Sequence, residues 1–183
     1  KAGIKPVVGI DFRNGVKQQF VGLAKNNDGF LALNRLLSQH LHLQQSFNRR
    51  APKMEEVVIV YPLAVVDYDW ELSGHEWIGI KISDLTRLPF SKWKNRRDKM
   101  VILQTATFQN KRDFNAHRLL RAIDNNKLLS QLPKDEEGSQ EQIFLPKEEL
   151  LHAFEGFSEI IANTQKVVDA CRIHFNYKGS NKS

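Results

Sequence analysis

The sequence predicts an α/β fold, and three features carry this prediction. Short apolar runs that are typical of strands alternate with segments whose apolar residues recur at helical spacing. Two of the runs, in EEVVIVYPL and KMVILQTATF, are apolar without interruption, as expected for strands buried on both faces of a sheet. Regular alternation of strand and helix favours a parallel sheet covered by helices. The chain has 183 residues, which is enough for one well-formed hydrophobic core.

The first part of the chain predicts a β-hairpin followed by a helix. Residues Pro6–Phe12 and the run VKQQFVGLAK (16–25) have the composition of strands. The turn RNG (13–15) joins them, because Asn-Gly readily supplies two positive φ angles. Asp28 is a candidate N-cap for the helix that follows. The apolar residues of this helix recur at helical spacing, at Phe30, Leu33, Leu36 and Leu37.

The middle of the chain predicts three further strands and one long helix. The strands lie in EEVVIVYPL (55–63), at the start of HEWIGIKISDLTRL (75–88) and in KMVILQTATF (99–108). A helical turn capped by Ser83 or Asp84 is expected after the second of them. The helix lies in KRDFNAHRLLRAIDNNKLL (111–129), and its spacing predicts one buried stripe. That stripe consists of Phe114, Leu119, Leu120 and Ile123.

The C-terminal part predicts a pair of helices behind a linker. Residues 133–142 are polar, acidic and rich in turn formers, so we interpret them as a mobile linker between residues 1–132 and residues 143–183. The first helix begins at the proline of LPKEELLHAF, and Ser158 is a candidate N-cap for the second. The expected buried face of the second helix consists of Ile160, Ile161, Val167, Val168 and Cys171.

The cysteine count and the lengths of the apolar runs indicate the cellular compartment. Cys171 is the only cysteine, which excludes an internal disulfide and suits a reducing compartment. No apolar run approaches the roughly 20 residues that span a bilayer, and no stretch has the pattern of a signal peptide. The sequence therefore predicts a cytoplasmic protein without a membrane partner.

Positive charge is concentrated in one stretch, RLPFSKWKNRRDK (87–99), which we call the basic segment. The whole chain has a net charge of +6. Cations with aromatic residues between them suit the phosphates and bases of a nucleic acid. The candidate nucleic-acid-binding residues are Lys92, Trp93, Lys94, Arg96 and Arg97. The alternative is a solvated loop that Trp93 anchors to the core, which is the more common reading of a charge run.

Four segments of the chain form a pattern in colinear order: AGIKPVVGIDF, FVGLAKNNDGFLALNRLLS, RDFNAHRLLRAIDNNKLL and FLPKEELLHAFEGFSEIIANTQKVVDAC. Together they resemble the PHP (polymerase and histidinol phosphatase) domain of bacterial DNA polymerase III alpha subunits. The resemblance implies a partial, distorted PHP-type (β/α) barrel with a C-terminal helical pair that leads toward the polymerase core. It also implies that the chain is a fragment that lacks the N-terminal units of the domain. The parent protein would then be a nucleotidyltransferase of DNA replication.

The same resemblance bears on a metal site. Active members of the family hold a cluster of divalent ions with His, Asp, Glu and Cys, and a metal-bound hydroxide attacks phosphorus. Asp11 matches an acidic ligand of that cluster. Thr105 and Thr107 stand where the family has an Asp and a His, and a neutral hydroxyl replaces neither. We therefore expect a degenerate site without catalytic residues and without a cofactor in this chain.

The expected role is then structural or one of docking, against the rest of a polymerase chain, DNA and other replication subunits. Two alternatives stay open. An upstream segment could restore a Zn, Mn or Mg site with Asp11, giving residual phosphoesterase or 3'-5' exonuclease activity. The basic segment could instead act as a nucleic-acid-binding module of its own. Whether the chain is an enzyme is left open, since it has no Gly-x-Ser-x-Gly motif and no P-loop.

Overall fold

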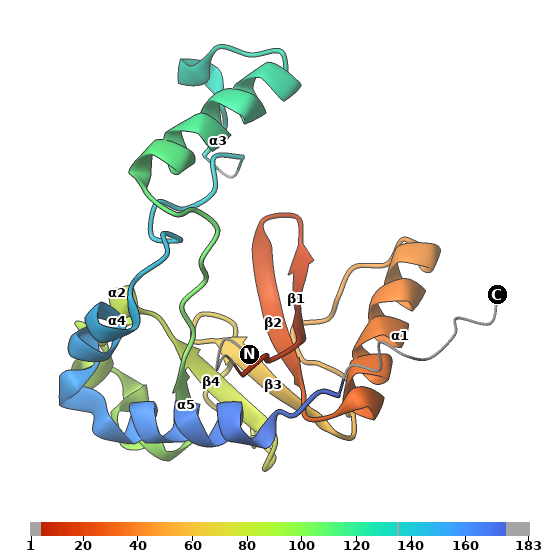
Figure 1. Ribbon diagram of the computed structural model, residues 1–183, viewed down its shortest axis with the longest axis vertical. Helices are drawn as coiled ribbons and strands as arrows, with labels where there is room; N and C mark the ends of the chain where they lie inside the picture. Colours follow the sequence, from red (N-terminus) through yellow and green to blue (C-terminus); the bar gives the residue numbers. More distant parts are fainter. Residues whose placement is uncertain (1–4, 135, 175–183) are drawn as a thin grey trace.

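The computed structural model describes residues 5–134 and 136–174 (Figure 1). Its strands are β1 (Gly9–Asn14), β2 (Lys17–Ala24), β3 (Val57–Pro62), β4 (Glu76–Ile80) and β5 (Met100–Ile102). Its α-helices are α1 (Asn27–Leu43), α2 (Ile82–Leu85), α3 (Lys111–Asp124), α4 (Lys147–Ala153) and α5 (Ser158–Ala170). Three short 3-10 turns between Leu88 and Lys99 join α2 to β5. The predicted α/β class is confirmed.

The strands form one open mixed sheet in the order β1-β2-β3-β4-β5. β2 runs antiparallel to both of its neighbours, whereas β3, β4 and β5 are parallel. The hairpin predicted for β1 and β2 is confirmed, and the predicted parallel arrangement is right for β3, β4 and β5 but wrong for the pairing of β2 with β3. The reason lies in residues 44–56. α1 runs back for about 25 Å, and this segment then returns the chain to the start of α1, so β3 enters the sheet antiparallel to β2.

Local details of the hairpin and of α1 differ from the expectation. The two residues of the hairpin loop are Gly15 and Val16, and of these only Gly15 has a positive φ, at 60°. The N-cap of α1 is Asn26 rather than Asp28. The side chain of Asn26 accepts a hydrogen bond from Gly29 N at 3.0 Å and donates one to Glu56 Oε2 at 2.9 Å. A tertiary contact thus selects one of several adjacent polar residues as the cap.

The core lies on both faces of the sheet. On one face, Phe12 and Phe20 stack with ring centroids 4.7 Å apart, and Leu33 of α1 packs into the same cluster. On the other face, a smaller cluster joins Val58, Val60 and Val101 to Val167 of α5. In Figure 1, α1 and α5 lie on different sides of the strands. α5 also buries Ile160 in the larger cluster, so the predicted apolar face of this helix is confirmed.

Polar side chains of α5 cover the edge of the sheet at β5. The Asn163 amide donates to the carbonyl oxygens of Arg97, Asp98 and Met100 at 3.1–3.2 Å. The Thr164 hydroxyl accepts from Ile102 N at 2.8 Å. These bonds satisfy backbone groups that a bare edge strand would expose. The β5 edge is therefore closed to another strand.

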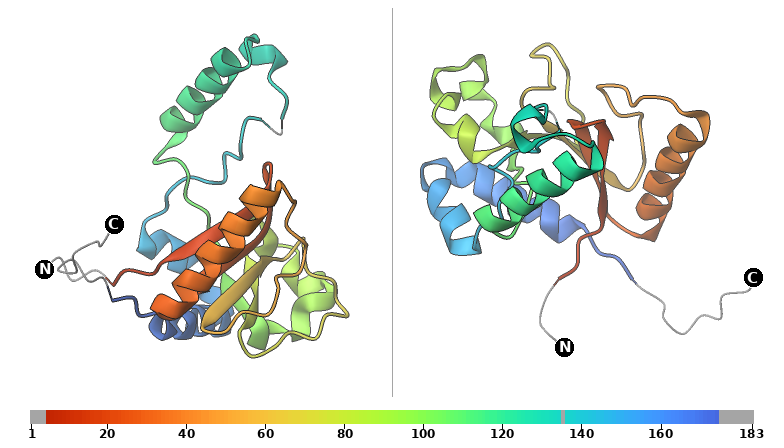
Figure 2. Two further views of the ribbon diagram at one scale, coloured as in Figure 1. Left: turned by 90° about the vertical axis from the view of Figure 1, so that its right-hand side faces the viewer. Right: turned by 90° about the horizontal axis from the view of Figure 1, so that it is seen from above.

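α3 stands away from the sheet on an arm (Figures 1 and 2). The arm consists of residues 104–134 and 136–144, which leave the sheet after β5 and return to α4. Phe114 is buried, but Leu119, Leu120 and Ile123 are 53%, 65% and 66% exposed. The prediction that all four would be buried together is wrong for these three, because no other layer covers this face of the helix in the described part of the chain.

The acidic segment 133–142, expected to be a free linker, is tied to α3 in its described residues. Glu137 is 7% exposed and bonds to Arg118 at 2.8 Å, and Glu136 pairs with Arg121. Phe108 and Phe114, whose rings meet edge to face, form a small apolar centre in the arm, and Leu132 is buried as well. Across residues 5–134 and 136–174, helices long and apolar enough to traverse a lipid bilayer are absent.

Candidate nucleic-acid interface and the predicted metal site

Asp11, the one retained ligand of the predicted metal cluster, lies on β1 with both carboxylate oxygens engaged. Oδ2 accepts from Arg13 Nε at 2.7 Å and Oδ1 accepts from Gln18 Nε2 at 2.9 Å. These partners come from the same hairpin and are an ion pair and an amide, not further metal ligands. Asp11 as a ligand stays a prediction, without a second ligand among the described residues.

Thr105 and Thr107 follow the strand at the other edge of the sheet, beyond its carboxyl end. Both follow β5, whereas Asp11 is on β1. Strands are spaced about 4.8 Å apart, so the axes of β1 and β5 are roughly 19 Å apart. The structure therefore does not bring together the three positions that the resemblance assigns to one cluster. Within residues 5–134 and 136–174, no three His, Cys, Asp or Glu side chains form a potential metal-binding group.

Thr105 instead lines a pocket of about 410 Å³ beyond the carboxyl ends of β4 and β5. Ligands of open α/β sheets often bind at this end of the strands. The segment that returns from the arm closes the pocket: Gln104 Nε2 donates to the Glu141 carbonyl at 2.8 Å, and Ser83 Oγ donates to Glu141 Oε2 at 3.1 Å. These polar groups of the pocket wall therefore bond to one another and hold the returning segment against the ends of the strands.

The basic segment carries most of the excess charge of the protein. It contains six cations and one carboxylate, and so it holds five of the six net positive charges. Among the described residues none of these six cations forms an ion pair. The cations are Arg87, Lys92, Lys94, Arg96, Arg97 and Lys99. Their field is therefore not cancelled by a direct carboxylate contact.

Short turns with buried anchors hold the basic segment on the body, as we call the sheet and its covering helices (residues 5–103 and 145–174). Leu88 is fully buried and Trp93 is 6% exposed. Ser91 joins two of the turns, because its hydroxyl donates to the Leu88 carbonyl at 2.8 Å and accepts from Trp93 N at 3.2 Å. Trp93 is thus an anchor, as the alternative interpretation expected. Its ring offers no open face for stacking on a base, which corrects that part of the nucleic-acid prediction.

Aromatic rings and carbonyl groups, rather than carboxylates, position several of the cations. Lys92 Nζ lies 5.0 Å from the ring centre of Tyr68, and the Arg96 guanidinium lies 5.9 Å from that of Trp93. Arg96 also donates to the Tyr68 carbonyl at 3.3 Å, and Lys99 Nζ donates to the Ser73 carbonyl at 2.7 Å. Such contacts fix the cations without neutralising them.

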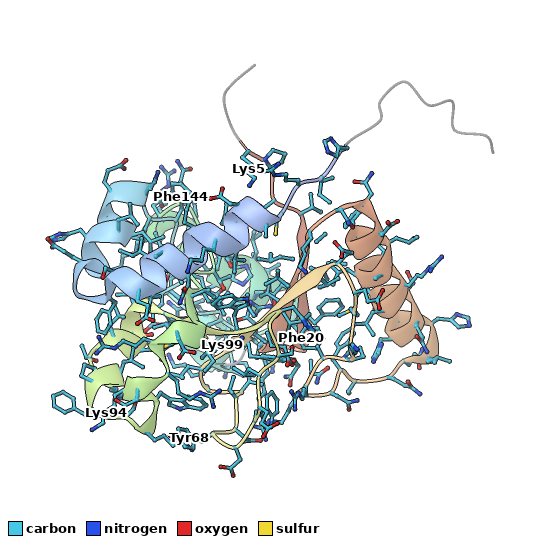
Figure 3. All side chains as sticks on the ribbon, turned by 90° about the horizontal axis from the view of Figure 1, so that it is seen from below. Lys5, Phe20, Tyr68, Lys94, Lys99 and Phe144 are labelled. Carbon is cyan, nitrogen blue, oxygen red and sulfur yellow. The ribbon has the colours of Figure 1, made fainter. Side chains whose placement is uncertain are left out.

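Phe90 is the exposed aromatic residue of the basic segment. It is 91% exposed, and it ends the 3-10 turn that starts at Leu88. Tyr68, from the neighbouring loop, is 40% exposed. Figure 3 shows Tyr68 and Lys94 along the outer rim of the body. Both aromatic residues lie in the basic segment, but the candidate residues predicted from the sequence include Trp93 and not Phe90, because composition does not indicate which of the two rings is buried.

A buried carboxylate at the start of β4 was also missed. Glu76 is 6% exposed and accepts hydrogen bonds from Tyr61 Oη at 2.7 Å, Arg50 Nη2 at 3.1 Å and Ser73 Oγ at 2.9 Å. Burial alone would raise the pKa of Glu76, but these bonds outweigh it and lower the pKa to about 2. Burial and the bond to Glu76 raise the pKa of Tyr61. This network joins Glu76 to the segment before β3, to β3 and to the loop before β4, and it occupies both carboxylate oxygens of Glu76.

No family model matches the chain, and no curated protein is significantly similar to it.

Proposed function

We propose that the chain binds single-stranded nucleic acid through the basic segment. The observation that carries this proposal is a segment of six cations, none of them ion-paired with a described residue, that also holds the exposed ring of Phe90. Lysine and arginine neutralise phosphates and release counterions, which supplies affinity without sequence preference. An exposed aromatic ring adds the stacking of a base, a contact that an unpaired strand allows and a duplex does not.

In this proposal, different residues of the basic segment have different tasks. Lys94 and Arg87 are exposed and would contact phosphates directly. Lys92 and Arg96 are held against Tyr68 and Trp93, so they would present charge from fixed positions. Phe90 would stack on a base between these phosphate contacts. Trp93 would support the segment from below rather than touch the ligand.

The proposal is tested by titrating a fluorescent oligothymidylate with the full chain at several salt concentrations. Reversing Lys94 or Arg96 to Glu should weaken binding, and the negative slope of log K against log salt should become shallower by about 0.7 for each lost phosphate contact. Lys127→Glu, which makes the same charge change on the arm, is the matched control and should bind like the wild type.

Stacking is tested separately with Phe90→Ala. Loss of one base contact is worth about 1–3 kcal/mol, so the affinity should fall by at least fivefold while the salt slope stays the same. Equal affinities for the wild type, Lys94→Glu and Arg96→Glu would refute the proposal. An effect of Lys127→Glu as large as that of Lys94→Glu would show attraction by net charge alone.

The family resemblance supplies a wider setting as a second candidate. In it the chain would be a scaffold portion of a DNA polymerase III alpha-type subunit, with a PHP-type barrel completed by other segments. The α/β class and the pair α4 and α5 support this candidate. The separation of Asp11 from Thr105 and Thr107 weakens the phosphoesterase alternative. Calorimetric titration with Mn²⁺ or Zn²⁺ tests the phosphoesterase alternative. A heat of binding that disappears in Asp11→Ala would support a metal site at Asp11.

A further inference from the structure

The outer edge of β1 offers unpaired backbone groups. Ala24 N donates to the Val8 carbonyl at 2.9 Å, and the register continues with Ile10 opposite Gly22. In an antiparallel ladder every second residue bonds to the neighbouring strand, so Ile10 and Phe12 face β2. The N–H and C=O groups of the intervening residues therefore point away from the sheet. These residues are Gly9, Asp11 and Arg13.

No described residue uses these groups. The backbone hydrogen bonds outside the strands and helices include none to Gly9, Asp11 or Arg13, and no described side chain bonds to them. The contrast with β5 is marked, because Asn163 and Thr164 close that edge. A strand edge left open in this way is a template for another strand.

The side chains along β1 restrict which strand fits. Asp11 and Arg13 are two places apart and so lie on the same face of the sheet, where they form an ion pair of 2.7 Å. Their side chains are 33% and 28% exposed. A strand that runs antiparallel and carries the same two charges in the same order is complementary to this edge.

We propose that β1 pairs with β1 of a second copy of this chain, in an antiparallel register that places Phe12 opposite Phe12. Asp11 of each copy then lies opposite Arg13 of the other, and each such pair exchanges two backbone hydrogen bonds. The arrangement has the twofold symmetry of an isologous dimer. It joins the two open sheets into one continuous sheet.

Charge selects this register over its neighbours. A shift of the second strand by two residues also keeps the outward-pointing backbone groups paired. That register places Asp11 opposite Asp11 of the second copy, and like charges directly opposite each other are unfavourable. The chosen register instead has two opposite-charge pairs related by symmetry. A single strand pair buries less area than the roughly 1,600 Å² of a standard interface, so we expect a weak dimer.

Sedimentation velocity of the full chain tests this interface, at concentrations up to about 1 mM to detect weak association. The wild type should show a dimer that grows with concentration. Asp11→Arg and Arg13→Asp should each raise its dissociation constant about tenfold, because each places like charges opposite one another twice. The double variant Asp11→Arg with Arg13→Asp keeps the complementarity and should restore the dimer. Asp69→Arg, on an exposed loop, is the matched control.

Hydrogen exchange of the wild type gives a readout that needs no variant. The amides of Asp11 and Arg13 should become protected as the concentration rises, whereas the already bonded amides of β3 should not change. If the protein stayed a monomer at every concentration, the proposal would be overturned. The charges of Asp11 and Arg13 would then act to prevent pairing of β1 with another strand. Dimers that neither single variant weakens would place the interface elsewhere. Lys94→Glu should leave dimerisation unchanged, which separates this proposal from nucleic-acid binding.

Discussion

At the scale of residues, Glu76 shows how one buried charge can join parts of the chain that are distant in sequence. It receives bonds from Arg50 in the segment before β3, Tyr61 in β3 and Ser73 in the loop before β4. Burying a carboxylate costs free energy, but bonds from charged and neutral donors offset that cost. The net effect is a carboxylate that stays ionised in the fold far below its ordinary pKa of 4.5.

Glu76→Gln should lower the free energy of unfolding by about 2–3 kcal/mol at pH 7, because Arg50 loses its partner and one amide group cannot accept all of these bonds. The pKa of Glu76 is lower in the folded state, so its contribution is complete above pH 4.5 and is lost as the pH falls toward 2. Urea unfolding at pH 7 and pH 3 measures both effects.

The exposed neighbour Glu71 provides the control for this experiment. Glu71→Gln should leave the stability at pH 7 within about 0.5 kcal/mol of the wild type. The wild type should lose more stability than Glu76→Gln between pH 7 and pH 3. The same loss in both proteins would mean that Glu76 is not the group that responds to acid.

At the scale of elements, α5 stabilises the sheet through polar contacts as well as apolar ones. Its Thr164 hydroxyl is the partner of Ile102 N, which would otherwise be an unpaired donor at the edge of β5. Such a group costs about 1–3 kcal/mol when it is left unsatisfied. The helix therefore hydrogen-bonds to the edge strand β5 in addition to packing on the sheet through apolar side chains.

Thr164→Val keeps the shape of this side chain and removes its hydroxyl. We expect the free energy of unfolding to fall by about 1–3 kcal/mol, because Ile102 N loses its acceptor. Thr107→Val makes the same change at an exposed site and should cost less than about 0.5 kcal/mol. Chemical denaturation of both variants gives the comparison, and equal costs would contradict the assigned role of Thr164.

The sequence predicted where these helices form better than which of their side chains are buried. The helical spacing in α3 and α5 is equally clear, and both helices form. Yet Ile160 is buried, whereas Leu120 of α3 is exposed, because the period of a helix indicates which side chains share a face and not what packs on that face. The cap of α1 was misplaced for a similar reason, since NND offers three caps and the contact with Glu56 selects Asn26.

At the scale of the whole molecule, the arm and the body have separate apolar centres. Phe108 and Phe114 belong to neither cluster of the sheet. α3 has 14 residues, and a helix of about this length is only marginally stable alone. Its small apolar centre and its ion pairs with Glu136 and Glu137 must therefore support it. We expect the arm to open without unfolding the body.

Phe114→Ala tests this independence. It should speed hydrogen exchange of the α3 amides by tenfold or more, since its loss removes about 3–5 kcal/mol of core packing from the small arm. All three tryptophans, Trp70, Trp77 and Trp93, lie in the body, so their fluorescence should report an unchanged unfolding transition. Leu120→Ser, at an exposed position of the same helix, should change exchange far less. If Phe114→Ala also destabilised the unfolding transition seen by tryptophan fluorescence, the arm and the body would unfold as one cooperative unit.

By itself the sequence determined the class of the fold, the positions of the strands and helices and the location of the excess charge, because periodicity and composition are local properties. Only the tertiary structure decided that β3 is antiparallel to β2, that Asp11 lies on one edge strand of the sheet whereas Thr105 follows the other, and that Phe90 rather than Trp93 is exposed. These facts depend on which distant segments meet. The return of residues 44–56 and the packing of the 3-10 turns settle them through contacts between residues far apart in the chain.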